Sequence, residues 1–193
     1  MPLSLETIER RLARHEPARP SRLAPTRAAV AAVLRFDRPA AEVLLMERAP
    51  RAGDRWSGQV SFPGGREEPE DPDLLATAVR ETREEVGLDI AACARPLGCL
   101  DPVRAVARGK LLPMSVTPFV FAQTRAAPLT LGVEAAAAFW LPLDRALSGE
   151  LAAVHEHRVG PTRLSFPCWR YQGHTIWGLT YRMLGDLLRV IAE

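Results

Sequence analysis

The chain has 193 residues, of which 47% are hydrophobic, and this composition suits one globular domain with a core of ordinary size. Its 25 basic and 23 acidic side chains leave a formal net charge of +2, which argues against the concentrated basic surface that nucleic-acid binding needs. No run approaches the roughly 18 apolar residues of a membrane-spanning helix, so we expect no membrane span.

The three cysteines, Cys93, Cys99 and Cys168, form neither a CxxC pair nor a Cys/His pattern typical of a zinc site. A disulfide framework is not expected in a chain of this length. The N-terminus also lacks the apolar stretch behind a basic segment that marks a signal peptide. We therefore expect the protein to work in the reducing cytoplasm.

Residues 1–25 predict a helix and then a proline-rich arm. Apolar residues recur at helical spacing from Leu3 to Ala13, and Ser4 is placed to cap this helix. Three prolines within residues 17–25 then interrupt the pattern. The main domain is therefore expected to span residues 26–193.

Two Val-rich apolar runs open the main domain, Arg27 to Phe36 and Ala41 to Arg48, and both predict strands. From Pro50 to Pro72, glycine, proline and charged residues predominate without periodicity, which predicts that most of this segment is loop.

Pro72 to Gly87 predicts the clearest helix, with Asp71 or Asp73 as its cap and Gly87 at its C-terminal end. The elements expected beyond it are strands near Pro96 to Leu100, Pro113 to Ala122 and Ala135 to Trp140, a short helix near Leu143 to Leu147, a strand or hairpin near Arg163 to Tyr171, and a final helix from about Thr175 to Ala192. Strands interleaved with helices predict an α/β or α+β sandwich.

Three carboxylates carry the chemistry of the predicted helix. Glu81, Glu84 and Glu85 stand at positions i, i+3 and i+4, so they share one face. Carboxylates this close repel one another unless a cation lies among them, and Mg²⁺ and Mn²⁺ prefer hard oxygen ligands. Arg80 can pair with Glu84 four residues on and orient it.

On spacing alone, the commoner interpretation of this face is an exposed helix surface with paired charges. The turn Phe62-Pro63-Gly64-Gly65 favours a metal site instead, because it brings bare backbone close to the helix, where a peptide carbonyl can act as a further ligand. A purely structural turn needs glycine but does not need an acidic helix face after it.

Gly65 followed by Arg80-Glu81-Thr82-Arg83-Glu84-Glu85-Val86-Gly87-Leu88 resembles the Nudix box, in which a glycine precedes an Arg-Glu-x-x-Glu-Glu-x-Gly segment. Thr82 replaces the usual aliphatic residue. The gap from Gly65 to Arg80 is one residue longer than usual, so the glutamate of the first half of the box falls on Glu70 or Asp71.

A second resemblance concerns the substrate. The segments 44–49 (LLMERA), 58–65 (GQVSFPGG) and 176–180 (IWGLT) resemble coenzyme A pyrophosphatases of the Nudix superfamily. The gap between Arg48 and Gly58 is one residue longer than in that signature, so Arg55 matches its second arginine only approximately. Together the two resemblances span about residues 27–188.

These resemblances imply a Nudix-type α/β/α sandwich with a mixed β-sheet. They also imply that the chain cleaves coenzyme A, and its thioesters as a further possibility, to 3',5'-ADP and 4'-phosphopantetheine, with Mg²⁺ or Mn²⁺ as cofactor. The metal ligands would be the side chains of Glu81, Glu84 and Glu85 and the carbonyl of Gly65. Arg80 would position Glu84, and Glu134 is a candidate general base, with a solvated turn acid as the alternative.

Phosphate recognition would fall to Arg27, Arg48 and Arg55, since the guanidinium fork fits phosphate oxygens in pairs. An ordinary surface contact is the alternative for each of these arginines. Phe62 and Gly64 complete the predicted substrate-binding set.

Two other functions stay open at this stage. The substrate could be ADP-ribose, a dinucleoside polyphosphate or a nucleoside triphosphate rather than coenzyme A. The chain could also be a Nudix-fold module that senses a nucleotide without cleaving it, although such a module would be expected to have lost box carboxylates. The expected partner is a small nucleotide, with neither nucleic acid nor membrane, and the oligomeric state is left open.

Overall fold

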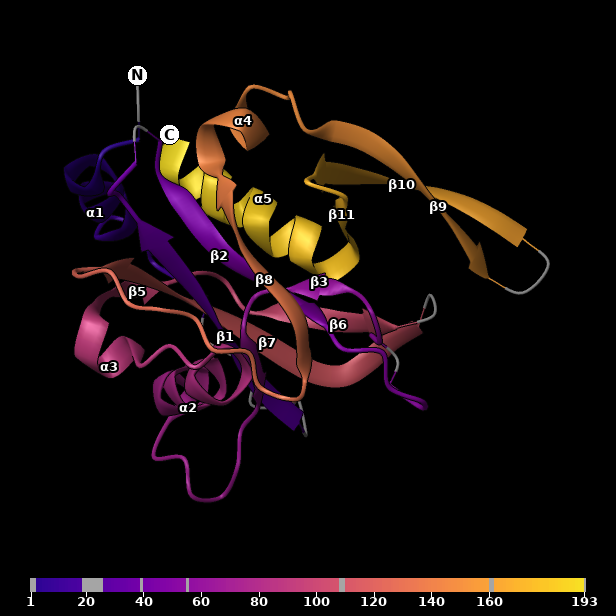
Figure 1. The fold of residues 1–193 in the computed structure, drawn as a ribbon, viewed down its shortest axis with the longest axis horizontal. Coiled ribbons are helices and arrows are strands. Elements are labelled where there is room, and N and C mark those ends of the chain that lie inside the picture. The colour runs from indigo at the N-terminus through magenta and orange to yellow at the C-terminus, as the bar shows by residue number, and fades with distance from the viewer. Residues whose placement is uncertain are drawn as a thin grey trace.

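The structure is a computed structural model that describes residues 3–18, 26–38, 40–54, 56–107, 110–159 and 162–192. Within these residues the main sheet has eight strands (Figure 1). The strands are β1 (Thr26–Arg35), β2 (Glu42–Arg48), β3 (Val60–Ser61), β4 (Gly64–Arg66), β5 (Ala94–Cys99), β6 (Val103–Ala107), β7 (Lys110–Gln123) and β8 (Ala135–Pro142). The helices are α1 (Leu5–Leu12), α2 (Leu74–Val86), α3 (Ile90–Cys93), α4 (Leu143–Leu147) and α5 (Gly178–Ala192).

The main sheet is mixed, as predicted. Its central path runs β3-β2-β1-β7-β5, with β4 added to β1, β6 to β7 and β8 to β2. Strands β1 and β7 pair in parallel, with Ala28 opposite Val116, while the other described pairs of this sheet are antiparallel. Because β1 is central, both of its faces are covered, which explains its continuous apolar run.

Helices cover both faces of the sheet and confirm the α/β/α sandwich. Val30 and Leu34 of β1 pack with α1 and α5 in one core cluster, whereas Ala31 and Val33 pack with α2 and α3 in the other. In Figure 1, α5 lies on one side of the sheet and α2 and α3 on the opposite side. Alternate side chains of one strand therefore feed two separate cores.

A second sheet of three described strands, β9 (Ala152–Val159), β10 (Thr162–Tyr171) and β11 (His174–Trp177), projects from the sandwich (Figure 1). The predicted start of the final helix at Thr175 is wrong. Gln172 and Gly173 both have positive φ, as in two-residue hairpin turns, so the chain doubles back and β11 pairs with β10 before the helix begins at Gly178.

The predicted loop from Pro50 to Pro72 also contains two short strands. Ser61 of β3 pairs with Met46 of β2, and Gly65 of β4 pairs with Ala29 of β1. These pairings join residues distant in sequence, so local periodicity does not reveal them.

The predicted N-terminal helix is present as α1, and the Ser4 hydroxyl caps it by accepting from the Thr7 amide. Ile8 and Leu12 are buried in the same core cluster as α5, and the Arg11 guanidinium donates to the Ile191 carbonyl. The predicted boundary at residue 25 lies outside the described residues, so the division of the chain there stays a prediction.

All three cysteines are free thiols, and two of them, Cys93 and Cys168, are buried. Of the helices that the structure describes, none combines the length and the apolar character that crossing a bilayer demands.

Candidate active site

Helix α2 is fixed at both ends. The Asp73 carboxylate caps its start by accepting from the Ala76 amide at 2.8 Å. Gly87 ends it with a left-handed φ of 66°, and a side chain there would collide with Thr130. The amides of Thr130 and Gly132 donate to the last carbonyls of the helix, at 2.9 and 2.8 Å. The acidic face is therefore carried on a rigid element.

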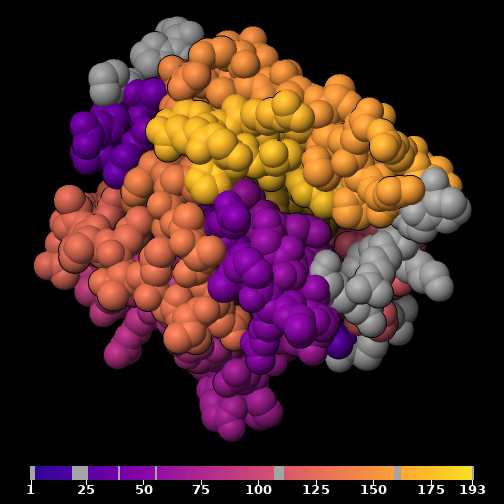
Figure 2. All heavy atoms as spheres, turned by 45° about the vertical axis from the view of Figure 1, so that its right-hand side comes forward, coloured from indigo at the N-terminus to yellow at the C-terminus, as the bar shows by residue number. Residues whose placement is uncertain are grey.

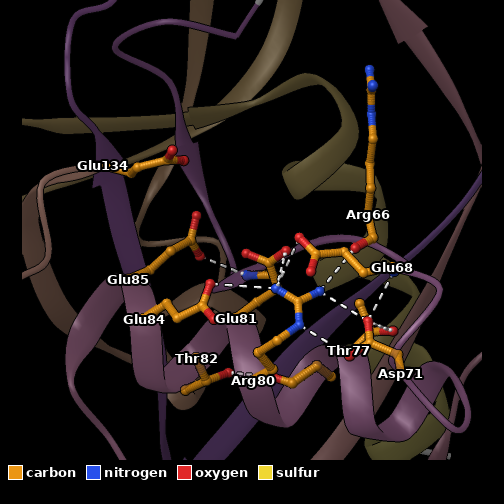
Figure 3. A network of polar contacts seen from close by, with 12 residues as sticks. Arg66, Glu68, Asp71, Thr77, Arg80, Glu81, Thr82, Glu84, Glu85 and Glu134 are labelled. Carbon is orange, nitrogen blue, oxygen red and sulfur yellow. Dashed lines mark hydrogen bonds and ion pairs between the residues drawn. The ribbon is translucent and has the colours of Figure 1, made fainter.

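Arg80 is the centre of the polar network on α2 (Figure 3). Its Nε and Nη2 donate to the two carboxylate oxygens of Asp71 at 3.0 and 2.9 Å. The remaining Nη1 donates to Glu81 at 3.1 Å and to Glu84 at 3.3 Å. The bidentate grip of Asp71 orients the guanidinium, and the guanidinium in turn orients two of the three helix carboxylates.

Of the two acids on which the first half of the box can fall, Asp71 is the one that contacts Arg80. Its side chain is only 6% exposed, whereas Glu70 is exposed. The hydrogen bonds from Arg80 hold the pKa of Asp71 well below its usual range, even though burial opposes this. The same pairing raises the pKa of Arg80 further, so the pair is ionised at every working pH.

We expect Asp71→Asn to lower the free energy of unfolding by about 2 kcal/mol, because it removes a charge-assisted bidentate contact from a buried site. The loss of orientation at Arg80 should lower kcat by about 10- to 100-fold. Urea unfolding and steady-state kinetics measure the two effects. Glu70→Gln is the matched control and should change stability by less than about 0.5 kcal/mol. Equal effects of the two substitutions would contradict the assignment of Asp71.

Glu85 is the most buried of the three helix carboxylates, with 3% exposure. It accepts the Gly64 amide at 2.8 Å and lies 3.4 Å from Nη1 of Arg48. Burial raises the pKa of Glu85 to about 7, although the Gly64 amide and Arg48 pull it down. Burial also raises the pKa of Glu81, against the opposing effect of Arg80, and repulsion from Glu84 and Glu134 adds to the rise. The protein contacts of Glu81 and Glu85 therefore do not fully balance the negative charge of these two carboxylates.

The raised pKa predicts how the stability of the metal-free protein depends on pH. Below about pH 4.5 Glu85 is protonated in both the folded and the unfolded state, so it contributes no difference. Between that pH and about 7 the unfolded state releases its proton first, so the free energy of unfolding falls, by up to about 3 kcal/mol in total.

Urea unfolding in a chelator, at pH 5 and pH 8, measures this loss. Glu85→Gln should remove most of it, and added Mg²⁺ should restore stability at pH 8 because the cation binds the ionised carboxylates. A pH dependence unchanged in Glu85→Gln would show that Glu85 is not its source.

The carboxylate oxygens of this site are the kind of ligand that a hard divalent cation prefers. Because Gly65 has no side chain, it leaves room for the Glu81 carboxylate: a Cβ at this position would lie 2.2 Å from Oε1 of Glu81. Across the described ranges, however, no three acidic, His or Cys side chains are already arranged around a common ion position. Arg80 holds Glu81 and Glu84, while the Gly64 amide and Arg48 hold Glu85.

A second ionic group lies beside Glu85. Arg48 contacts Asp54 through Nε at 3.2 Å and lies 3.8 Å from Glu134, which also pairs with Arg51 at 3.2 Å. Glu134 is 46% exposed and lies on the same side of α2 as Glu85 in Figure 3. Burial would raise the pKa of Asp54, but the Trp56 amide and Arg48 together lower it.

A cleft of about 1050 Å³ connects these groups with an apolar region. Its lining includes Arg48, Glu81, Glu84, Glu85 and Glu134, and also residues of β1, β3, β7 and α5. The first turn of α5 is bound to β3, because the Thr180 hydroxyl donates to the Val60 carbonyl at 2.8 Å. Figure 2 shows the outside of this region, with the violet chain before residue 65 against the yellow C-terminal segment.

Most of the predicted site residues are brought together in this cleft, including Arg80, Gly64, Gly65 and Phe62, whose side chain is almost fully buried. Arg27 is not among the residues that line it and instead forms an ion pair with Glu67. Arg55 lies outside the described residues.

Three residues of the site were missed from the sequence. Asp54 and Arg51 lie in a segment without periodicity, and Gly132 contacts the end of α2 from a distant loop. A Cβ at Gly132 would lie 2.1 Å from the Glu84 carbonyl. Only the glycine itself hinted at this close approach.

Comparison with known proteins agrees with this fold. Residues 25–160 match the NUDIX domain model. Over 159 residues the chain is 34% identical to the uncharacterized Nudix hydrolase NudL of Yersinia pestis, covering 80% of this chain and 75% of the relative. A Nudix hydrolase from M. smegmatis, RenU, has a similar fold with a TM-score of 0.50 at 20% identity, over 63% of this chain and 73% of that one.

A MutT/nudix family protein from Enterococcus faecalis also has a TM-score of 0.50, at 16% identity, over 97% of this chain and 68% of that one. The class of fold is thus defined by two features. An acidic helix follows a glycine turn, and a mixed sheet lies between two layers of helices. The chain belongs to the Nudix hydrolase family.

Proposed function

We propose that the protein is a metal-dependent pyrophosphohydrolase that cleaves coenzyme A to 3',5'-ADP and 4'-phosphopantetheine. The observation that carries the proposal is the position of residues 58–65, the segment that resembles coenzyme A pyrophosphatases. Gln59, Val60, Ser61 and Phe62 of this segment line the cleft, and the Gly64 amide binds the most buried box carboxylate, Glu85. The substrate-related segment and the acidic helix thus share one cleft.

The cofactor that we propose is Mg²⁺ or Mn²⁺, held by Glu81, Glu84 and Glu85 with the Gly65 carbonyl. When bound, such an ion neutralises pyrophosphate charge and lowers the pKa of a bound water. Family membership supports this, since Nudix hydrolases generally need divalent cations.

The chain's own residues position the reactants. Arg80, gripped by Asp71, keeps Glu81 and Glu84 on one side of the cleft. Arg48 and Arg51 border the same region and can pair with phosphate oxygens once substrate displaces their carboxylate partners. A water oxygen attacks one phosphorus in line, the bond from that phosphorus to the bridging oxygen breaks, and the proton of the water passes to a carboxylate base.

Glu134 is the base that we propose. It is half-exposed at the cleft, on a loop facing Glu85, so it can reach a water without belonging to the set of proposed metal ligands. Its contacts with Arg48 and Arg51 keep the carboxylate directed toward the phosphate region.

The test is a substrate panel with purified protein and Mg²⁺ or Mn²⁺, with products separated by chromatography. We expect coenzyme A to give 3',5'-ADP with a higher kcat/KM than that for AMP from ADP-ribose. If ADP-ribose, a dinucleoside polyphosphate or a nucleoside triphosphate is cleaved faster than coenzyme A, that compound and not coenzyme A is the substrate. Binding without any turnover would favour a sensing module, which the three retained box carboxylates argue against.

A further inference from the structure

Four ring side chains gather on the second sheet, apart from the cleft and its carboxylates. His155 and His157 stand two positions apart on β9, so both side chains leave the strand on the same face. Phe166 of β10 pairs with His155, and Trp177 of β11 contacts the Phe166 ring, so these two residues extend the same group. We call the four residues the imidazole–indole cluster. The β9–β10 hairpin that carries most of it projects from the sandwich in Figure 1.

The two imidazoles converge on one indole. The ring centroid of Trp177 lies 4.5 Å from that of His155 and 4.6 Å from that of His157. The two imidazole centroids are 5.9 Å apart, and their planes are tilted by 33°. Two imidazoles that bind one metal ion through nitrogens about 2 Å from it have centroids roughly 5 to 6 Å apart. The two rings therefore have the spacing that a two-histidine chelate needs.

The Nε2 atom of His155 points independently to a ligand. It is buried, and among the described residues it has no hydrogen-bond partner. Buried polar groups are nearly always paired, because an unpaired one costs stability. Burial lowers the pKa of His155, and the nearby His157 and Arg170 add to this effect. The imidazole is therefore neutral at pH 7, which is the form that binds metal ions.

The charges around the cluster decide which kind of ion fits. Glu156 and Arg158 alternate with the two histidines along β9, so they lie on the opposite face, where Arg163 is 3.7 Å from Glu156. On the cluster face, Arg170 donates to the Val154 carbonyl at 3.1 Å. Among the residues described in these three strands, no carboxylate shares the face of the histidines. Nitrogen ligands without carboxylates disfavour Mg²⁺ and favour late transition metals.

We propose that His155 and His157 form a second metal site, separate from the cleft, which binds a late transition-metal ion and prefers Cu²⁺. Imidazole suits such ions, and the affinity of a given site rises from Mn²⁺ to Cu²⁺ and falls again at Zn²⁺. All four residues of the imidazole–indole cluster are half-buried, so solvent reaches the cluster and water can fill the remaining coordination positions. The inference does not depend on the proposed function.

The experiment titrates the full chain with Cu²⁺ and follows both tryptophan fluorescence and the heat of binding. Excess Mg²⁺ is present throughout, so that the carboxylates of the cleft are supplied with a hard cation. Because Cu²⁺ quenches an indole beside it, the fluorescence of Trp177 should fall as the ion binds. Trp177→Phe should lose most of this quenching, while the affinity measured by calorimetry stays within about threefold, because the indole supplies no ligand atom. Zn²⁺ should bind at least about tenfold more weakly than Cu²⁺.

Two histidine variants decide whether the ion lies at the proposed site. His155→Gln and His157→Gln should each weaken Cu²⁺ binding at least about tenfold, because each removes one of two protein ligands. His15→Gln makes the same change at a histidine of the N-terminal segment and should leave binding unaltered. The site is overturned if the wild-type protein does not bind Cu²⁺, if both ligand variants keep its affinity, or if the quenching persists in Trp177→Phe. Should His155→Gln lose its native circular dichroism, His157→Gln alone decides.

Discussion

Glu84→Gln is expected to lower metal-dependent kcat by roughly 10³-fold while the fold stays intact. The carboxylate contributes negative charge to the proposed cation site, and such sites supply several kcal/mol of transition-state stabilisation. The amide keeps the shape of the side chain and can still accept from Arg80, which lies 3.3 Å away. Because Glu84 is 58% exposed, the substitution should change the free energy of unfolding of the protein by less than about 0.5 kcal/mol.

Kinetics at several Mn²⁺ concentrations, with urea unfolding of the same samples, measure both quantities. Glu70→Gln makes the identical chemical change at an exposed acid that is not in the Arg80 network, and it should leave kcat and metal dependence unaltered. Turnover near the wild-type value in Glu84→Gln would exclude Glu84 as a metal ligand, because the variant contains no second substitution that could replace the lost charge.

The parts of the site that were predicted from the sequence are those governed by local geometry. Helix α2 was expected because its caps and its apolar spacing lie within one segment, and the shared face of Glu81, Glu84 and Glu85 follows from helical periodicity alone. The pairing of Arg80 with Glu84 follows from the same i,i+4 rule.

The parts that the sequence left open or predicted wrongly depend on the path of the chain in three dimensions. Asp71 and Glu70 are neighbours, and only the path of the loop decides which of them is buried against Arg80. The predicted final helix includes most of β11, and the pairing of this strand with β10 overrides local preference. Arg27 meets Glu67 across forty residues of sequence, which no local pattern could indicate.

Neighbouring glycines in the turn before α2 should respond very differently to alanine. At Gly64 a Cβ would lie 2.3 Å from the Ala29 carbonyl oxygen and 2.5 Å from the Val30 Cα, and φ is +151°. These obstacles are backbone atoms of the central strand, so they cannot move without breaking the β1–β4 pairing. We expect Gly64→Ala to lower the free energy of unfolding by more than about 4 kcal/mol.

At Gly65 the obstacle is the end of a flexible side chain. A Cβ would lie 2.2 to 2.7 Å from the carboxylate atoms of Glu81, which can swing aside. Gly65→Ala should therefore keep stability within about 1 kcal/mol of the wild-type value, yet lower kcat roughly 100-fold by displacing a proposed metal ligand. Urea unfolding and kinetics on both variants make the comparison. If Gly65→Ala kept full activity, Glu81 would not need its present position for catalysis. If Gly65→Ala unfolded as readily as Gly64→Ala, the role of Gly65 would be structural, because a displaced carboxylate alone does not disrupt the central strand.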